Sequence, residues 1–154
     1  MIKTSNVTKL FNKGRPDEVI AVSDVSMEIR KGDFVVLKGP SGSGKTTLLS
    51  LIGCMGRPSS GSVVVDGRDV SHLPERFLTG MRRATFGFIF QQFHLIKGIS
   101  VMDNVMLPLY PAGTRPAVLR QKAIETLRYL DMEKRKDFPV QRLSCGEQQR
   151  TAIA

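Results

Sequence analysis

Apolar and polar residues alternate along two N-terminal segments, residues 2–8 and 19–30. A two-residue period of this kind predicts strands with one buried face, and the turn-forming residues 12–17 between them predict an antiparallel pair. Residues 62–65 form a further apolar strand pattern that closes in an Asp-Gly turn. The chain is therefore expected to begin with a small antiparallel β region.

Two continuous apolar runs have a different pattern, which predicts strands buried on both faces. The first, residues 34–37, leads into a glycine-rich stretch, and the second, residues 85–90, ends at a pair of glutamines. Between these runs, residues 46–55 and 74–83 have helical patterns. Buried strands separated by helices predict an α/β core sheet.

Helical patterns dominate the rest of the chain. Ser100 is a candidate N-cap for a short helix that ends before Pro108, and Pro116 suits the first turn of a longer one. Apolar residues recur on one face of this longer helix, at Leu119, Ala123, Leu127 and Leu130, which predicts core packing. After a loop at residues 143–146, residues 147–154 have the composition of another helix.

The glycine-rich stretch before the first helix fits the pattern GxxxxGK[ST] at Gly39, Pro40, Ser41, Gly42, Ser43, Gly44, Lys45 and Thr46. Glycines let backbone N–H groups close around phosphate oxygens, and the helix start directs its positive dipole end at them. We expect Lys45 to pair with the β- and γ-phosphates, Thr46 to offer a hydroxyl to Mg²⁺, and Thr47 to reach the α-phosphate. The sequence therefore predicts a P-loop that binds a nucleoside triphosphate.

A P-loop alone leaves several classes open, because kinases, GTPases, motor ATPases and transporters share it. No Asn-Lys-x-Asp motif for reading guanine occurs, which makes a GTPase the weaker interpretation. A small-molecule kinase would need a substrate pocket and lid arginines, and it would leave residues 143–150 unexplained. A nucleotide-binding module without hydrolysis stays a further alternative.

Further segments decide between these classes. Residues 143–150, Leu-Ser-Cys-Gly-Glu-Gln-Gln-Arg, resemble the LSGGQ signature motif, and residues 87–91, Gly-Phe-Ile-Phe-Gln, resemble a Q-loop. Phe11 is an aromatic residue upstream of the P-loop. In this order the segments resemble the ABC transporter ATPases, and the resemblance covers nearly the whole chain. It implies the α/β fold of that family, with a P-loop core sheet, an antiparallel β region and a helical subdomain.

The resemblance implies a role for each of these residues. Phe11 would stack on adenine, and Gln91 would touch Mg²⁺ or water and sense the membrane partner. The signature residues expected to act in trans, on the γ-phosphate bound by a second subunit, are Ser144, Cys145, Gly146, Glu147 and Gln148. ATP and Mg²⁺ are therefore the expected cofactors, with Thr46 and Gln91 as Mg²⁺ contacts.

Within the family, the chain looks most like the branch for lipoprotein release, macrolide export and cell division, through residues 52–54, 88–96 and 147–150. The resemblance implies a head-to-tail dimer with a second ATPase subunit, and an integral-membrane permease as partner. The expected location is the cytoplasm, at the inner face of the cell membrane. The formal net charge of +9 suits a polyanion or an anionic membrane surface, but no nucleic-acid-binding motif accompanies it. Nucleic acid is therefore not an expected partner.

The sequence departs from the family pattern in two ways. Cys145 stands where the signature normally has glycine, so its side chain would crowd the phosphate or resist a backbone with φ > 0. Residues 1–154 also lack the strand ending in Asp-Glu, the D-loop and the switch histidine, and Asp66, His72 and His94 are in the wrong places to replace them. We expect the chain to bind ATP with little or no hydrolysis by itself, as a portion of a longer polypeptide rather than a truncated natural product.

Composition fits a single incomplete domain over residues 1–154, with 41% hydrophobic and 24% charged residues. Its expected parts are an ATP-binding core (1–92), a helical subdomain (93–142) and the signature with the start of a helix (143–154). The two cysteines, Cys54 and Cys145, have no metal-type spacing and suit a reducing compartment. No apolar run reaches the length of a membrane span.

Overall fold

The computed structural model describes residues 1–154, apart from the side chain of Ala112. The chain forms two compact units, Met1–Gly87 (unit 1) and Phe88–Ala154 (unit 2). Each unit has its own hydrophobic core. The division expected from the sequence, with boundaries after residues 92 and 142, stays a prediction.

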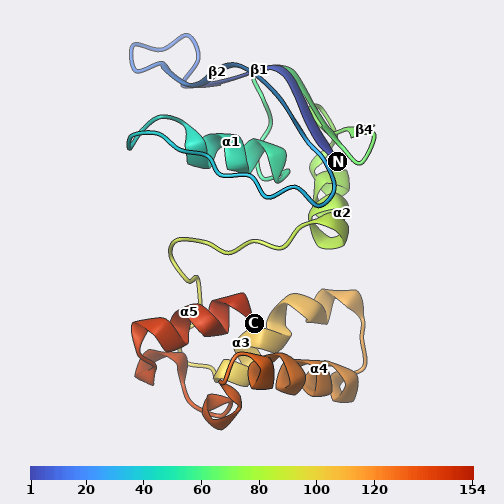
Figure 1. Ribbon diagram of the computed structural model, residues 1–154, viewed down its shortest axis with the longest axis vertical. Helices are drawn as coiled ribbons and strands as arrows, with labels where there is room; N and C mark the ends of the chain where they lie inside the picture. Colours follow the sequence, from blue (N-terminus) through green and yellow to red (C-terminus); the bar gives the residue numbers. More distant parts are fainter. The chain divides into compact units, whose positions relative to one another are not determined.

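Unit 1 contains a four-stranded sheet in the order β2-β1-β3-β4, shown at the top of Figure 1. Its strands are β1 (Ile2–Phe11), β2 (Val19–Ile29), β3 (Ser60–Val65) and β4 (Arg68–Asp69). All neighbouring pairs are antiparallel, and Ile2 lies opposite both Ile29 of β2 and Val65 of β3. The predicted antiparallel β region is therefore confirmed.

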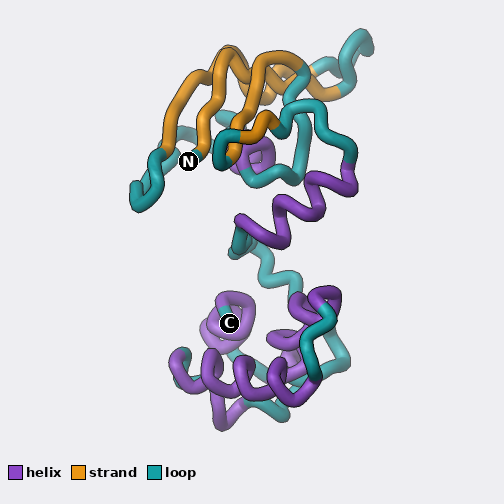
Figure 2. The backbone as a smooth tube through the Cα atoms, turned by 90° about the vertical axis from the view of Figure 1, so that its right-hand side faces the viewer, coloured by secondary structure: helices purple, strands orange, loops and turns teal.

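One face of this sheet is covered by α1 (Lys45–Ile52), as Figure 2 shows. Leu48, Leu51 and Ile52 are the buried residues of α1, and they share a core with Val7, Val22 and Val63 of the strands, among others. A fully buried side chain of this size stabilises the fold by about 1.5–3 kcal/mol. This packing fixes the first turn of α1 against the sheet, which positions the glycine-rich loop that precedes it.

The structure contradicts two predicted strands. Residues 34–37 form no regular element and pair with no strand among the described residues, and the side chain of Phe34 is 93% exposed. Residues 85–90 are also outside any strand, and α2 (Glu75–Thr85) takes in Thr85. An apolar run indicates only that its side chains can be buried. A strand also needs hydrogen-bonded neighbours, and these two runs have none within the described sheet.

The regular elements of unit 2 are helices. Unit 2 contains α3 (Val101–Met106), η1 (Leu107–Ala112), α4 (Pro116–Tyr129), η2 (Glu133–Arg135), η3 (Val140–Arg142) and α5 (Cys145–Ile153). α3 contacts both α4 and α5, and all three carry labels in Figure 1. The predicted helices are confirmed, although α5 begins at Cys145 rather than Glu147.

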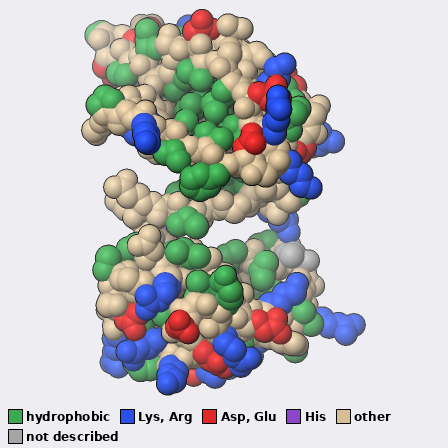
Figure 3. Space-filling view, viewed as in Figure 1, with side chains coloured by type: hydrophobic (Ala, Val, Ile, Leu, Met, Phe, Trp, Pro, Cys, Tyr) green, Lys and Arg blue, Asp and Glu red, His purple; other side chains and the backbone are tan. Residues whose placement is uncertain are grey.

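Local signals explain why these helices form where they do. Ser100 caps α3 with a capping box, in which its hydroxyl accepts from the backbone N–H of Asp103. On α4, Leu119, Ala123 and Leu127 are buried, and Leu130 packs against the same core. Charges of both signs intermingle on the face of unit 2 drawn in Figure 3. Among the described residues, no helix has the length and apolar character needed to cross a membrane.

Candidate functional site

The glycine-rich loop leads straight into α1 and leaves the start of that helix open. Gly44 is the N-cap of α1, with φ 81°, and no side chain caps it. The first turn carries no acidic residue. The unpaired N–H groups and the positive end of the helix dipole therefore meet no carboxylate of their own helix, which favours an anion there.

Gly44 also lies in close contact with the sheet. A Cβ atom built on it would lie 2.0 Å from the backbone oxygen of Ala21 on β2 and 3.4 Å from a methyl group of Val22. Only glycine fits this position, because both the backbone conformation and the contact exclude a side chain. The loop is thus held against β2 at Gly44.

The ammonium group of Lys45 is held by the loop itself. Its Nζ donates to the carbonyl oxygens of Gly39 at 2.9 Å and Pro40 at 2.6 Å, and to the hydroxyl of Ser43 at 3.2 Å. These three acceptors are neutral. Because hydrogen bonds between charged partners are the stronger kind, phosphate oxygens can replace them.

A cavity of about 630 Å³ opens beside the loop in unit 1. Its wall is apolar on the side of β2 and polar on the side of the loop. The lining includes Ile20, Val22, Val36, Gly39, Ser43 and Lys45. Hydrophobic side chains gather on the face of unit 1 drawn in Figure 3. The space is large enough for a small organic ligand with an anionic end.

The hydroxyls of Thr46 and Thr47 follow Lys45 in the first turn of α1, where Thr46 is exposed and Thr47 half-buried. No cluster of three or more His, Cys, Asp or Glu residues that suits a metal ion occurs among the described residues. A hydroxyl beside a phosphate site fits Mg²⁺, which takes one or two protein oxygens and completes its octahedron with phosphate and water.

Phe11 ends β1, opposite Val19, and its side chain is 46% exposed. The ammonium of Lys9 lies 5.2 Å from the centroid of the Phe11 ring and also donates to the carbonyl of Arg57 at 2.8 Å. A partly exposed aromatic ring at a strand end can stack on a flat base.

Gln91 lies in unit 2, on an exposed irregular segment rather than at the end of a strand. Aromatic contacts order the residues around it. The rings of Phe88 and Phe90 are stacked at 5.9 Å, and His94 meets Phe90 edge-on at 5.0 Å. The assignment of Gln91 as a Q-loop residue stays a prediction.

The signature residues form the N-terminal end of α5. Ser144 is its N-cap in a capping box with Glu147: the Ser144 N–H and Oγ both donate to Glu147 Oε2 at 2.8 Å. Gly146 is exposed in the first turn. The Gln148 side chain donates to the carbonyl of Leu143 at 3.0 Å.

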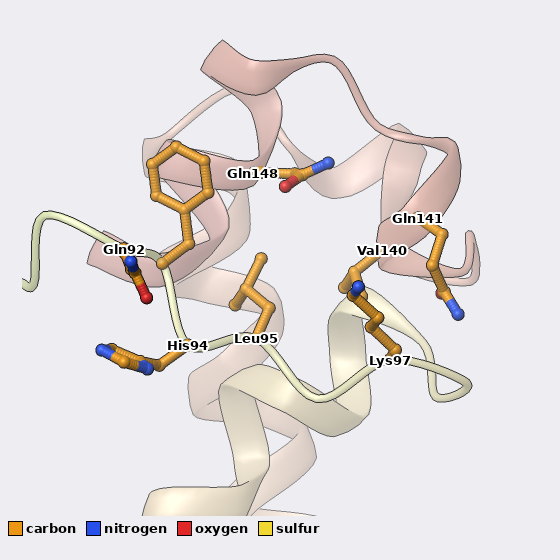
Figure 4. Close-up of a pocket in the computed structure, with 8 residues that line it drawn as sticks. Gln92, His94, Leu95, Lys97, Val140, Gln141 and Gln148 are labelled. Carbon is orange, nitrogen blue, oxygen red and sulfur yellow. The ribbon is translucent and has the colours of Figure 1, made fainter.

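Gln148 also lines a cavity of about 250 Å³ in unit 2, across from Leu95 and Val140 in Figure 4. His94 and Lys97 come from the segment on the other side of this cavity. The amide of Gln148 is therefore engaged within its own unit.

The backbone of Cys145 does not have the positive φ that the sequence analysis considered for this position. Cys145 is the first residue of α5 and is absent from the non-glycine residues with positive φ, so the backbone strain expected for a cysteine there does not arise. The thiol is free and exposed. Whether its side chain crowds a phosphate stays a prediction.

Sequence reasoning missed one residue of this region, Arg135 of η2. Its guanidinium Nε donates to Glu147 Oε1 at 2.8 Å and lies 4.9 Å from the ring centroid of Phe138. No local pattern links Arg135 with Glu147, because they are 12 residues apart. By contrast, the Ser-x-x-Glu spacing of the capping box was a readable signal for a helix that starts at Cys145.

The hydrogen bonds from Ser144 and Arg135 lower the pKa of the Glu147 carboxyl from 4.5 to about 2. A folded-state pKa below the unfolded value means that this carboxylate stabilises α5 above about pH 4.5. That stabilisation is lost as the pH falls from about 4.5 towards 2.

Acid unfolding should therefore depend on Glu147. We expect Glu147→Gln to flatten the loss of thermal stability between pH 5 and about pH 3, measured by circular dichroism. The matched control is Glu125→Gln on the exposed surface of α4. Equal acid sensitivity of the Glu147 variant and the parent chain would contradict the assignment.

Comparisons with known proteins agree with this geometry. A model of the family described as "ABC transporter" matches residues 22–154. The ATP-binding protein MJ0796 of Methanocaldococcus jannaschii, described as an uncharacterized ABC transporter protein, is 42% identical over 159 residues, covering 100% of this chain and 67% of the relative. The macrolide export ATP-binding/permease protein MacB of Burkholderia pseudomallei is 40% identical over 154 residues, covering 100% of this chain and 23% of MacB. The chain thus spans less than a quarter of MacB.

A solved structure matches the fold closely. The dimeric post-hydrolysis state of the MJ0796 ATP-binding cassette, bound to ADP and Pi, superposes with a TM-score of 0.91 at 38% identity, over 99% of this chain and 67% of that chain. The α/β fold class and the branch expected from the sequence are confirmed by these matches.

Proposed function

Because the chain belongs to the ABC transporter family, we propose that it couples ATP binding and hydrolysis, in a head-to-tail dimer, to a membrane permease. The observation that carries the proposal is the loop at residues 39–46. There, the start of α1 has no side-chain cap, and the Lys45 ammonium lies against the carbonyl of Gly39 in the same loop. This is an arrangement for holding the phosphates of a nucleotide.

The residues of the loop have separate tasks in this proposal. Lys45 exchanges the carbonyls of Gly39 and Pro40 for the β- and γ-phosphates, while Ser41 to Gly44 offer backbone N–H groups. Thr46 would hold Mg²⁺ through its hydroxyl, and Gln91 would be a second contact. When bound, the ion would neutralise phosphate charge. Phe11 stacks on the adenine ring.

The partners of the proposal are a second ATPase subunit and a permease. MJ0796 has been solved as a dimer, and MacB is an ATP-binding/permease protein, which supports both kinds of partner. Ser144 and the N–H of Gly146 contact the terminal phosphate held by the other subunit, since both are exposed at the N-terminal end of α5. The site of action is the cytoplasmic face of the membrane.

Residues 1–154 supply the binding site but not every hydrolytic group. These residues contain no strand pattern ending in Asp-Glu after the signature, and in this proposal such a carboxylate orients the attacking water. We expect these 154 residues alone to bind Mg-ATP and to hydrolyse it at or below the detection limit. A nucleotide-binding module that does not hydrolyse ATP is the second candidate.

The test is a steady-state phosphate-release assay on the 154-residue chain beside a longer polypeptide that adds the corresponding region of MJ0796. Turnover in the longer polypeptide alone supports an ATPase. Turnover in neither, with ATP bound by both, supports the non-hydrolysing module. Rapid turnover by the 154 residues alone would contradict the non-hydrolysing module, and also the expectation that these residues need further groups for hydrolysis.

A further inference from the structure

Three groups at the start of α5 form a connected chain of hydrogen bonds. Arg135 Nε donates to Glu147 Oε1 at 2.8 Å, and the other carboxylate oxygen, Oε2, accepts from the N–H and the Oγ of Ser144, each at 2.8 Å. Ser144 Oγ in turn accepts from the N–H of Glu147 at 3.3 Å. The Ser144 hydroxyl is thus fixed from two sides by Glu147.

A serine hydroxyl has one proton, and here that proton is donated to Glu147. To donate to a phosphate, Ser144 must turn this proton away from the carboxylate. Its Oγ can stay in place during the turn, because the bond from the Glu147 N–H holds it from the other side. The Glu147 carboxylate therefore competes with any phosphate for the same proton.

The charge of Glu147 makes Arg135 necessary in this competition. An uncompensated carboxylate would hold the Ser144 proton tightly and would repel a phosphate. The Glu147 side chain is only 18% exposed, and Arg135 is its ion-pair partner in η2. The stacking of the guanidinium on Phe138 keeps Arg135 on the side of Glu147.

We propose that Arg135 is a positioning residue: it neutralises and orients Glu147 so that Ser144 can release its hydroxyl proton to the terminal phosphate held by a second copy of this chain. The inference rests on the proposed head-to-tail dimer. It assigns to Arg135, which acts through Glu147, control over how tightly the signature closes on ATP.

The test is ATP-dependent self-association of the chain, measured by sedimentation velocity with Mg-ATP. We expect Arg135→Ala to weaken it roughly three- to tenfold, because the unpaired Glu147 carboxylate would then repel the phosphate across a solvated surface. Glu147→Gln keeps a capping-box residue without the charge, and its own association constant is the reference for the double variant. In the Glu147→Gln background, Arg135→Ala should then have little further effect, and Arg135→Lys should restore at least half of the loss.

A purely structural role for Arg135 predicts something different, namely the same loss in both backgrounds, and that result would overturn the inference. Titration of the Glu147 carboxyl by NMR gives a readout without ATP. Its pKa should be higher in Arg135→Ala than in the parent chain, and an unchanged pKa would also overturn the inference. No self-association of the parent chain with Mg-ATP would refute the proposed dimer, whereas normal association in Arg135→Ala would refute the role of Arg135 alone.

Discussion

Replacing Lys45 with alanine is expected to weaken Mg-ATP binding by roughly 30- to 150-fold, the equivalent of about 2–3 kcal/mol for a lost hydrogen bond to a charged group. The ammonium of Lys45 donates to three neutral acceptors of the loop, and phosphate oxygens can take the place of these acceptors. Isothermal titration calorimetry of the folded variant measures the change directly.

The control is Lys31→Ala, which removes an exposed lysine from the turn that follows β2. It lowers the net charge equally but leaves the loop intact, so its affinity for Mg-ATP should stay within about twofold of the parent chain. Equal weakening by both substitutions would mean that general positive charge, rather than the Lys45 contact, attracts the nucleotide.

Replacing Gly44 with alanine should disrupt the loop itself. The added Cβ would meet the Ala21 carbonyl oxygen at 2.0 Å, in a backbone conformation that side chains rarely adopt. We expect a loss of roughly 3–4 kcal/mol in the free energy of unfolding, and with it the loss of ATP binding. Urea unfolding followed by circular dichroism measures the first effect.

Gly42 offers a matched control for the contact. Its φ of 80° is almost the same as the 81° of Gly44, but a Cβ on Gly42 would have nothing within 4 Å. Gly42→Ala therefore carries the conformational cost alone, about 1–2 kcal/mol. Similar losses for the two variants would show that the approach of the loop to β2 is not what requires glycine at position 44.

Features that depend on neighbouring residues could be predicted from the sequence. The cap at Ser100, the buried stripe from Leu119 to Leu127 and the antiparallel pairing of β1 with β2 all follow from local spacing. The P-loop pattern likewise predicted a helix directly after the glycine-rich stretch, although α1 begins at Lys45 rather than at Thr46.

Features that depend on distant partners could not be predicted. Residues 34–37 have the composition of a buried strand, yet a strand forms only where another backbone lies beside it, and Phe34 is instead exposed. The contact of Gly44 with Ala21 and the bond of Arg135 to Glu147 likewise join residues that no periodicity connects. In these cases the tertiary contact, not the local pattern, decides the outcome.

Hydrogen exchange of the 154-residue chain, followed by mass spectrometry with and without Mg-ATP, tests the central claim most directly. Binding at the P-loop predicts slower amide exchange in residues 39–48 of the parent chain, and no such protection in Lys45→Ala at the same nucleotide concentration. Unchanged exchange in this segment, with ATP bound and protection confined to other residues, would contradict the assignment of the loop as the nucleotide site.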